Sequence, residues 1–208
     1  MIHLTAADLH FLGDNEKERR RDLCLHGSVF LSIDGTVLCD GGEWCVTVSA
    51  LRFMRSVFVD HISASGEQMI PCCGHFMIPS GDGKTVDIVG CSNGIDFDVT
   101  HESGGITVKT ADGMIFLTDP GEYRRAVTGY SKEIGRFMQN QPARVIDDRW
   151  ERSAFAAFCE EWNTLSERLL IPLRPLIPRS GKDAAKSKKT PGYSGVFLLY
   201  AGTEAVFS

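Results

Sequence analysis

Potentially reactive side chains gather in the middle of the chain, between residues 68 and 91. Cys72, Cys73 and His75 lie in one stretch bracketed by prolines, and Cys91 ends the apolar run that follows. If the first stretch is extended, the Gly-Asp-Gly step after it reverses the chain into a second strand. The spacing therefore predicts a central hairpin that gathers these side chains, and thiolate chemistry and metal binding are the two activities they could supply.

One hypothesis for this cluster is a thiol nucleophile. Cys73 and His75 would share one face of a strand, and Cys91 would lie on the neighbouring strand. Asn93 or Asp96, near the next turn, would be placed to orient the histidine. Catalytic cysteines, however, commonly sit at a helix start or a strained turn, whereas Cys73 is predicted inside a strand. We therefore favour the interpretation that these cysteines pack the sheet as small hydrophobic residues.

A metal site is the second hypothesis for the same cluster. Its candidate ligands are Cys73, His75, Cys91 and His101. Adjacent side chains of a strand point to opposite faces, so Cys72 and Cys73 cannot both bind one ion unless a bulge intervenes. The sequence contains neither the Cys-x-x-Cys pairs nor the His-Glu-x-x-His helix of common zinc sites. We therefore expect no metal and no other cofactor.

Two carboxylates share one face of a strand predicted over residues 95–101. There, apolar residues alternate strictly with polar ones, and the polar face carries Asp96 and Asp98. Lys109 lies on the strand that should pair beside them, which indicates a solvated face with cross-strand charge pairs. The sequence thus predicts a charged interaction surface formed by Asp96, Asp98 and Lys109.

Alternating residues and turn signals place most of the strands in the first half of the chain. Strands are predicted over 28–33, 36–39 and 44–48, with an Asp-Gly turn between the first two. The periodicity then changes, and apolar residues recur at helical spacing over 50–61. After the central hairpin, three more short strands follow, each separated from the next by a glycine-containing turn.

Two longer helices are predicted after the strands. Asp119, Pro120 and Glu122 form a helix start with an N-cap aspartate and proline in the first helical position. That helix is predicted over 119–140, and a second one over 149–170. The fold class is therefore α+β: an antiparallel meander sheet of about seven or eight short strands, one inserted helix, and two C-terminal helices packed on the sheet.

Composition divides the chain into one main domain and its flanks. Residues 1–26 carry mixed charges and few apolar positions, which indicates a solvated segment, and 27–178 are predicted to form one domain. Residues 179–192 should be a flexible linker, because they are rich in Lys, Ser, Ala and Gly. Residues 193–208 contain a large apolar run, so we expect this tail to dock as a strand in cis or to join copies into a homo-oligomer.

The charge and hydropathy of the chain argue against two classes of partner. The net charge of −5 gives no reason to expect nucleic acid, because phosphate binding depends on clustered Lys and Arg. No stretch approaches the roughly 18 apolar residues of a membrane-spanning helix, and the N-terminal segment does not resemble a signal peptide. We therefore expect a cytoplasmic protein with neither a nucleic-acid nor a membrane partner.

Two classes of function remain open. An acidic α+β domain without a convincing catalytic set is typical of a non-enzymatic protein-interaction module, for example a bacterial toxin-neutralising (immunity-type) or regulatory protein with a basic protein partner. The alternative is a thiol- or metal-dependent hydrolase that uses Cys72, Cys73, His75 and Cys91. The interaction module is favoured because packing already explains cysteines that lie among apolar neighbours.

Overall fold

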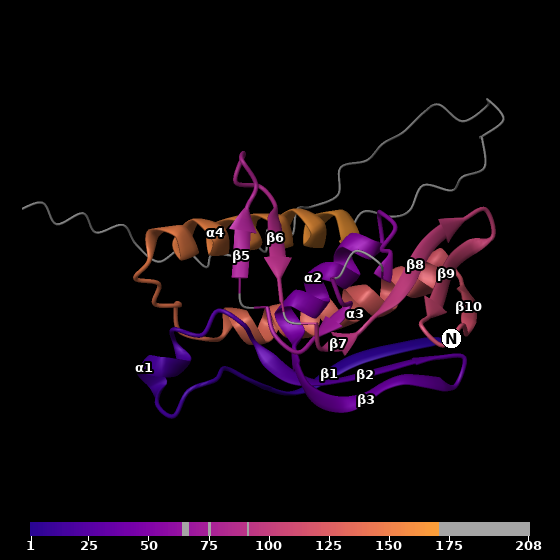
Figure 1. Ribbon diagram of the computed structural model, residues 1–208, viewed down its shortest axis with the longest axis horizontal. Coiled ribbons are helices and arrows are strands. Elements are labelled where there is room, and N and C mark those ends of the chain that lie inside the picture. Colours follow the sequence, from indigo (N-terminus) through magenta and orange to yellow (C-terminus); the bar gives the residue numbers. More distant parts are fainter. Residues whose placement is uncertain (64–66, 75, 91, 171–208) are drawn as a thin grey trace, which may run out of the picture.

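Figure 1 shows the computed structural model of the chain, which describes residues 1–63, 67–74, 76–90 and 92–170. The linker and the tail predicted at 179–208 lie outside these residues. The described helices and strands are, in chain order, β1 (Ile2–His10), α1 (Glu16–Arg19), β2 (His26–Ile33), β3 (Thr36–Cys45), α2 (Val46–Ser56), β4 (Ile70–Pro71), β5 (Phe76–Pro79), β6 (Val86–Val89), β7 (Gly94–Ile95), β8 (Phe97–Glu102), β9 (Gly105–Thr110), β10 (Ile115–Thr118), α3 (Pro120–Gln139) and α4 (Arg149–Leu170).

The α+β class is confirmed, but the single meander sheet is wrong. All described strand pairs are antiparallel, and they form four small sheets: β1-β2-β3, β10-β9-β8, β4-β7 and β5-β6. The strand that follows β3 in the chain cannot add to the same sheet as the next strand of a meander, because the chain enters α2 directly after Cys45. The hairpin β5-β6, where the central hairpin was predicted, packs against α4 instead of joining a neighbouring sheet (Figure 1).

Strand β1 is an element that the sequence analysis did not predict. Ile2, Leu4 and Ala6 are buried and alternate with exposed residues, which is the pattern of a strand with one face on the core. The strand pairs antiparallel with β2 and packs against α3. The charged run that follows it does include a short helix, α1, whose N-cap Asn15 accepts a hydrogen bond from the backbone N–H of Glu18 at 3.0 Å.

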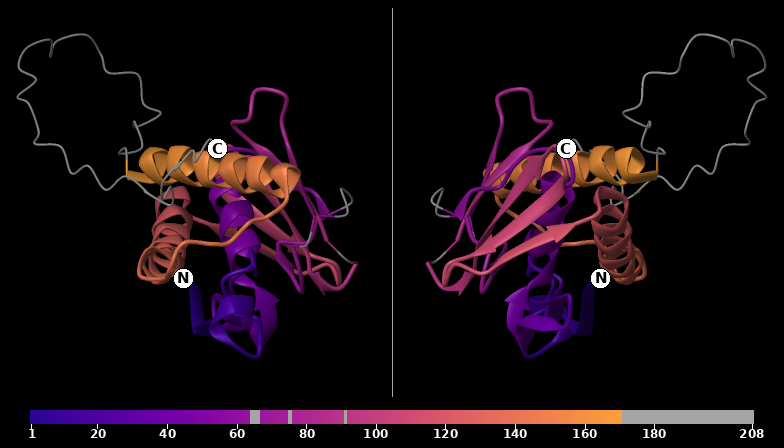
Figure 2. Two further views of the ribbon diagram at one scale, coloured as in Figure 1. Left: turned by 90° about the vertical axis from the view of Figure 1, so that its left-hand side faces the viewer. Right: turned by 90° about the vertical axis from the view of Figure 1, so that its right-hand side faces the viewer.

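Helix α2 is the buried centre of the fold. Figure 2 shows it between the two long helices on one side and the β8-β9-β10 sheet on the other. The helix was predicted over 50–61, yet it begins at Val46 and ends at Ser56. Val46, Thr47 and Val48 favour a strand by local preference, but all three are fully buried, and this packing decides the conformation.

The two C-terminal helices are confirmed, with ends close to the predicted ones. Asp119 caps α3 by accepting a hydrogen bond from the Glu122 N–H at 2.8 Å, and Pro120 is the first helical residue. Tyr123 and Tyr130 of α3 and Trp162 of α4 are among the largest fully buried side chains. Within the described residues, no helix is both long enough and apolar enough to cross a membrane.

Candidate functional site

The structure describes only part of the predicted cysteine and histidine cluster. His75 and Cys91 lie outside the described residues, so their predicted roles stay predictions. Cys72 and Cys73 were predicted inside a strand, but they lie between β4 and β5. Cys73 is 6% exposed, and Cys72 is half-buried. The backbone N–H of Cys72 donates to the Asn93 carbonyl oxygen at 3.2 Å, which brings two of the predicted residues side by side.

The backbone packs tightly around Cys73. A Cβ atom added to Gly90 would lie 2.6 Å from the Cys73 carbonyl oxygen, and one added to Gly74 would lie 2.3 Å from Val48 Cγ2. Contacts below 3.0 Å do not occur for real Cβ atoms, so both positions require glycine or a shift of their neighbours. This crowding agrees with the packing interpretation of Cys73 and gives no support to a nucleophile that must approach a substrate.

Two other cysteines, far apart in the sequence, meet at the N-terminal end of α2. Cys45 is the N-cap residue of α2, and Cys24 lies just before β2. Cys45 Sγ lies 3.7 Å from Thr47 Oγ1, and each of the two thiols affects the pKa of the other. Cys24 Sγ also donates to the Gly74 carbonyl oxygen at 3.3 Å. The sequence analysis missed this pair because it placed the helix start several residues after Cys45.

The surroundings of the two thiols move their pKa values in opposite directions. The neighbouring Cys45 side chain, together with burial, raises the pKa of Cys24 well above its ordinary value. Burial alone would also raise the pKa of Cys45, but the interactions with its neighbours, with Cys24 first among them, outweigh burial and lower that pKa. An anion at a helix N-terminus is also favoured by the helix dipole.

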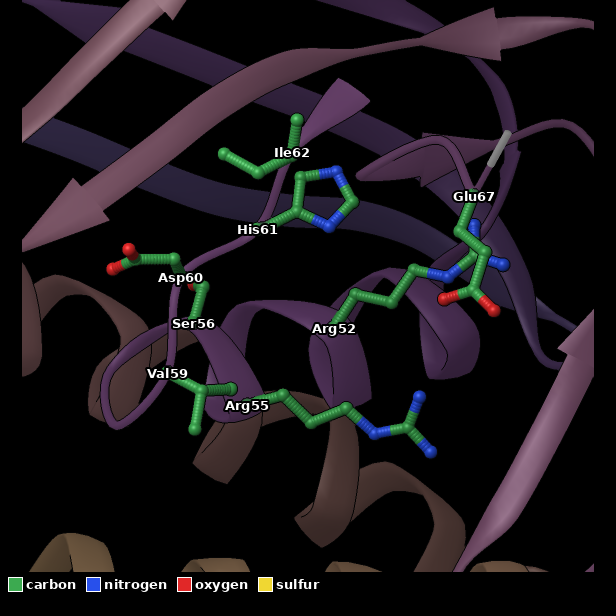
Figure 3. Close-up of a pocket in the computed structure, with 8 residues that line it drawn as sticks. All are labelled: Arg52, Arg55, Ser56, Val59, Asp60, His61, Ile62 and Glu67. Carbon is green, nitrogen blue, oxygen red and sulfur yellow. The ribbon is translucent and has the colours of Figure 1, made fainter. Parts of the chain in front are cut away.

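A pocket of about 370 Å³ lies beside the C-terminal half of the same helix (Figure 3). It is lined by Arg52, Arg55, Ser56, Val59, Asp60, His61, Ile62 and Glu67. Figure 3 shows Arg52 reaching from α2 toward Glu67, with the ring of His61 above the helix. The apolar side chains of Val59 and Ile62 are exposed in this region. The lining of the pocket therefore combines charged side chains with exposed apolar ones.

Arg52 ties separate segments to α2 and is nearly inaccessible, with 3% of its surface exposed. Its Nη2 donates to the Ile88 carbonyl oxygen at 3.0 Å, and its Nη1 donates to the Gln68 carbonyl oxygen. The buried Nε has no hydrogen-bond partner among the described residues. Burial lowers the pKa of Arg52, and the nearby charge of Glu67 opposes that shift. The role of Arg52 that these contacts support is structural.

Arg55, which is partly buried, forms an ion pair with the buried Glu161 of α4. Its Nε and Nη2 donate to the two carboxylate oxygens of Glu161 at 2.7 and 2.8 Å, the bidentate geometry that suits a guanidinium. Glu161 Oε2 also accepts from the Val86 N–H at 2.9 Å, and Arg55 Nη2 donates to the Val86 carbonyl oxygen. The pair thus joins α2, α4 and β6.

A series of polar pairs joins the segment after α2 to β8, and we call it the polar seam. Its members are Asp60, His61, Ser63, Asp96, Asp98 and His101. His61 Nε2 lies 2.9 Å from Asp96 Oδ1, which also accepts hydrogen bonds from the backbone N–H groups of Met69 and Phe97. The backbones of His61 and Val99 exchange two hydrogen bonds of 2.8 Å.

The rest of the polar seam contains two of the predicted site residues, Asp98 and His101. Asp98 Oδ1 accepts hydrogen bonds from the Ser63 N–H at 2.8 Å and from the Ser63 hydroxyl at 2.7 Å, and Asp98 lies opposite Lys109 on β9, as predicted. His101 Nδ1, proposed as a metal ligand, lies 2.8 Å from Asp60 Oδ1. Within the described ranges, no group of three or more His, Cys, Asp or Glu side chains is arranged to hold a metal ion.

The pocket offers a hydrogen-bonded histidine but no accessible nucleophile in the part of its lining that is described. The His61 and Asp96 pair could orient a ring for general-base chemistry. Ser56 contributes a hydroxyl, but it is 1% exposed, donates to the Phe53 carbonyl oxygen and lies 2.8 Å from the Tyr123 hydroxyl. The geometry therefore supports a structural role for these groups better than it supports hydrolysis.

An apolar surface lies on the outer face of the β8-β9-β10 sheet. Ile115 and Leu117 on β10 are 67% and 58% exposed, whereas Val99 and Val108 of the inner face are fully buried. Ile115 lies opposite Lys109, and Leu117 lies opposite Thr107.

Comparisons of the chain with protein families, curated proteins and solved structures found no match.

Proposed function

We propose that the protein is a non-enzymatic, cytoplasmic protein-interaction module that binds a basic, strand-forming segment of a partner protein along β10. The observation that carries this proposal is the exposure of Ile115 and Leu117 on an edge strand. Large apolar side chains that are adjacent and exposed commonly mark a binding surface. A toxin-neutralising or regulatory protein would use such a surface to cover part of its target.

The edge of β10 supports this mode of binding through its backbone. In the described sheet, β10 is the last strand and has β9 as its hydrogen-bonded neighbour. An edge strand presents N–H and C=O groups to which an extended segment can add as a new strand. Apolar side chains of that segment would then cover Ile115 and Leu117, and each fully buried side chain contributes roughly 1.5 to 3 kcal/mol.

The charges around β10 favour a basic partner. Asp112 and Asp119 are exposed and lie on either side of the strand. The charge of Lys109, opposite Ile115, is balanced across the sheet by Asp98. The whole chain is also acidic, with a net charge of −5, which steers a positively charged partner toward it.

Two short peptides with blocked ends test the proposal on the full-length chain. One alternates Val with Lys, and the other alternates Val with Glu. We expect the basic peptide to bind and to perturb the backbone amide NMR signals of residues 115–118. Replacing Ile115 and Leu117 together by Ser removes the apolar contact without adding charge and should weaken this binding at least about tenfold, because about 1.4 kcal/mol of lost contact corresponds to that factor.

The matched control is Val37→Ser, which removes an exposed apolar side chain from β3 instead of β10. This variant should bind the basic peptide as the unchanged chain does. The proposal is wrong if neither peptide binds, if the acidic peptide binds as tightly as the basic one, or if the β3 variant loses as much affinity as the β10 variant.

The homo-oligomer predicted through residues 193–208 needs a separate measurement. We compare the sedimentation of the full chain with that of a chain that ends at Pro178, because the shorter chain keeps the whole of β10. If the tail joins copies, the full chain should sediment as a dimer or larger and the shorter chain as a monomer. Equal association states would rule out oligomerisation through the tail without affecting the peptide result.

A further inference from the structure

A second pocket, of about 230 Å³, lies where α1 meets the connection between α3 and α4, at one end of the molecule (Figure 1). Its lining is basic, although the chain as a whole is acidic. Arg19, Arg20 and Arg144 contribute three guanidinium groups, and Glu16 contributes the one carboxylate in the described lining. We call it the arginine pocket. It shares no lining residue with the pocket of Figure 3.

Hydrogen bonds between α1 and the α3-α4 connection hold the walls of the arginine pocket together. The backbone N–H of Val145 donates to the Arg20 carbonyl oxygen at 2.8 Å. In the same region, Arg20 Nε donates to the Ala143 carbonyl oxygen at 3.2 Å, and Arg144 Nη1 donates to the Arg19 carbonyl oxygen at 2.8 Å. The pocket is therefore already formed in the folded chain and does not require a ligand to assemble it.

The three guanidinium groups of the arginine pocket bond to carbonyl oxygens of the main chain and form no ion pair with any described residue. The neighbouring Arg21, by contrast, is paired with Asp147 at 2.7 Å. The carboxylate of Asp22 lies close by, but its oxygens accept the backbone N–H groups of Leu12 and Cys24. The pocket therefore keeps a surplus of positive charge, because a neutral carbonyl group cannot balance a cation.

An aromatic ring fixes the orientation of Arg144. Its guanidinium carbon lies 3.8 Å from the centre of the Phe11 ring, and the Phe137 ring lies 6.5 Å from that of Phe11. Stacking on an aromatic face leaves the edge of the planar guanidinium group available for hydrogen bonds. Leu9 and Phe137 also line the pocket and are half-buried. A charged wall and an apolar wall thus face the same small space.

We propose that the arginine pocket binds a small phosphate monoester, with the phosphate group on the arginines and an apolar body against Leu9 and Phe137. Guanidinium groups bind phosphate oxygens in a bidentate manner. A phosphate monoester carries a charge of about −1.5 to −2 at pH 7, which matches three arginines opposed by one glutamate better than a carboxylate does. The ligand is small, because pockets for drug-sized molecules begin at roughly 300 Å³.

The test titrates phenyl phosphate into the full-length chain and follows the backbone amide NMR signals. We expect saturable shifts in residues 9–20 and 141–145. Benzoate has less charge, inorganic phosphate lacks the apolar body, and benzyl alcohol has no charge, so each should bind at least about tenfold more weakly than phenyl phosphate. Added salt should weaken the binding of phenyl phosphate, because it screens the charges of the partly exposed arginines.

Two variants and a matched control assign the binding to these arginines. Arg144→Gln should weaken phenyl phosphate binding at least about tenfold, because hydrogen bonds to charged groups are the strong ones. Arg19→Gln alters an exposed side chain and should weaken binding about threefold or more, which keeps the test decisive if circular dichroism shows the Arg144 variant unfolded. Arg21→Gln removes the same charge from the same segment outside the pocket and should bind as the unchanged chain does.

Several outcomes would overturn the proposal. They are the absence of saturable binding, shifts that avoid both lining segments, and benzoate or benzyl alcohol that binds as tightly as phenyl phosphate. Inorganic phosphate of equal affinity would refute the apolar wall as part of the site, and an Arg21 variant as weak as the Arg19 variant would refute the role of the pocket arginines. None of these measurements depends on β10, so they leave the proposed interaction surface to its own test.

Discussion

The two ends of α2 are buried by different means. At its N-terminal end, Val46 and Val48 are fully buried and Gly74 fits against Val48 with no room for another atom. At its C-terminal half, Arg52 and Arg55 are covered by segments that accept their hydrogen bonds. The packing of the N-terminal end therefore depends on a close fit between apolar groups, whereas that of the C-terminal half depends on hydrogen bonds to the two arginines.

This difference arises because apolar and charged side chains lose different interactions with water when they are buried. An apolar side chain gains by burial alone, so its neighbours need only fit closely. A guanidinium loses its hydration on burial and must regain hydrogen bonds and an opposite charge. The same helix should therefore be sensitive to added volume at one end and to removed charge at the other.

The largest effect is expected where a buried charge loses its partner. Glu161→Ala removes the carboxylate that binds Arg55 and the Val86 N–H. Removing one partner of a fully buried pair costs about 3 to 5 kcal/mol. Because the Arg55 side chain is partly exposed, we expect a loss near the lower end of that range. Urea denaturation followed by circular dichroism measures the change in the free energy of unfolding.

Two controls sharpen this prediction. Asp147→Ala removes the partner of Arg21 from an ion pair of similar length, 2.7 Å, that is exposed, and it should cost less than about 1 kcal/mol. Replacing Arg55 and Glu161 together by Met should cost less than Glu161→Ala alone, because no unpaired charge remains. If Glu161→Ala lowered the free energy of unfolding no more than Asp147→Ala does, the importance of charge at this end of α2 would be contradicted.

A smaller effect is expected from added volume at the other end. In Gly74→Ala, the new Cβ would lie 2.3 Å from Val48 Cγ2 and 3.2 Å from Cys45 Sγ. Overpacking of this kind typically costs about 1 to 3 kcal/mol, because neighbours must leave their preferred positions. Gly81→Ala is the matched control, since nothing lies within 4 Å of its Cβ. Equal unfolding free energies for the two variants would refute the close fit.

Local signals were enough to predict several elements of the fold. Asp119 and Pro120 mark the start of α3 in the sequence, and the structure places them there because capping depends on neighbouring residues. The outer position of Lys109 opposite Asp98 also followed from alternation alone. The division into four small sheets could not be predicted, because it depends on how α2 packs between segments that are distant in sequence.

The candidate site was harder to predict than the fold. Val46, Thr47 and Val48 are all β-branched, which led to a predicted strand and concealed the helix that begins after Cys45. The meeting of Cys24 with Cys45 is a long-range contact that no spacing reveals. One usable signal existed, a cysteine directly before a helix, but it is recognised only when the helix start is known.

The smallest expected effect concerns acid and the polar seam beside α2. The hydroxyl and then the backbone N–H of Ser63 hold the pKa of Asp98 below its ordinary value of 3.8. The folded state therefore binds this proton less readily than the unfolded state, so the stabilisation is complete above about pH 4 and is lost as the pH falls through the lower folded pKa.

In Asp98→Asn, this source of acid sensitivity is absent. Its unfolding free energy should be lower than that of the unchanged chain at pH 6, and the difference should shrink as the pH falls from about 4 to 3, because the unchanged chain loses its advantage there. Asp87→Asn, which alters an exposed carboxylate on β6, is the matched control and should run parallel to the unchanged chain. Urea midpoints measured at each pH decide the matter, and a difference that stays constant down to pH 3 would mean that the Ser63 and Asp98 contact does not favour the ionised carboxylate.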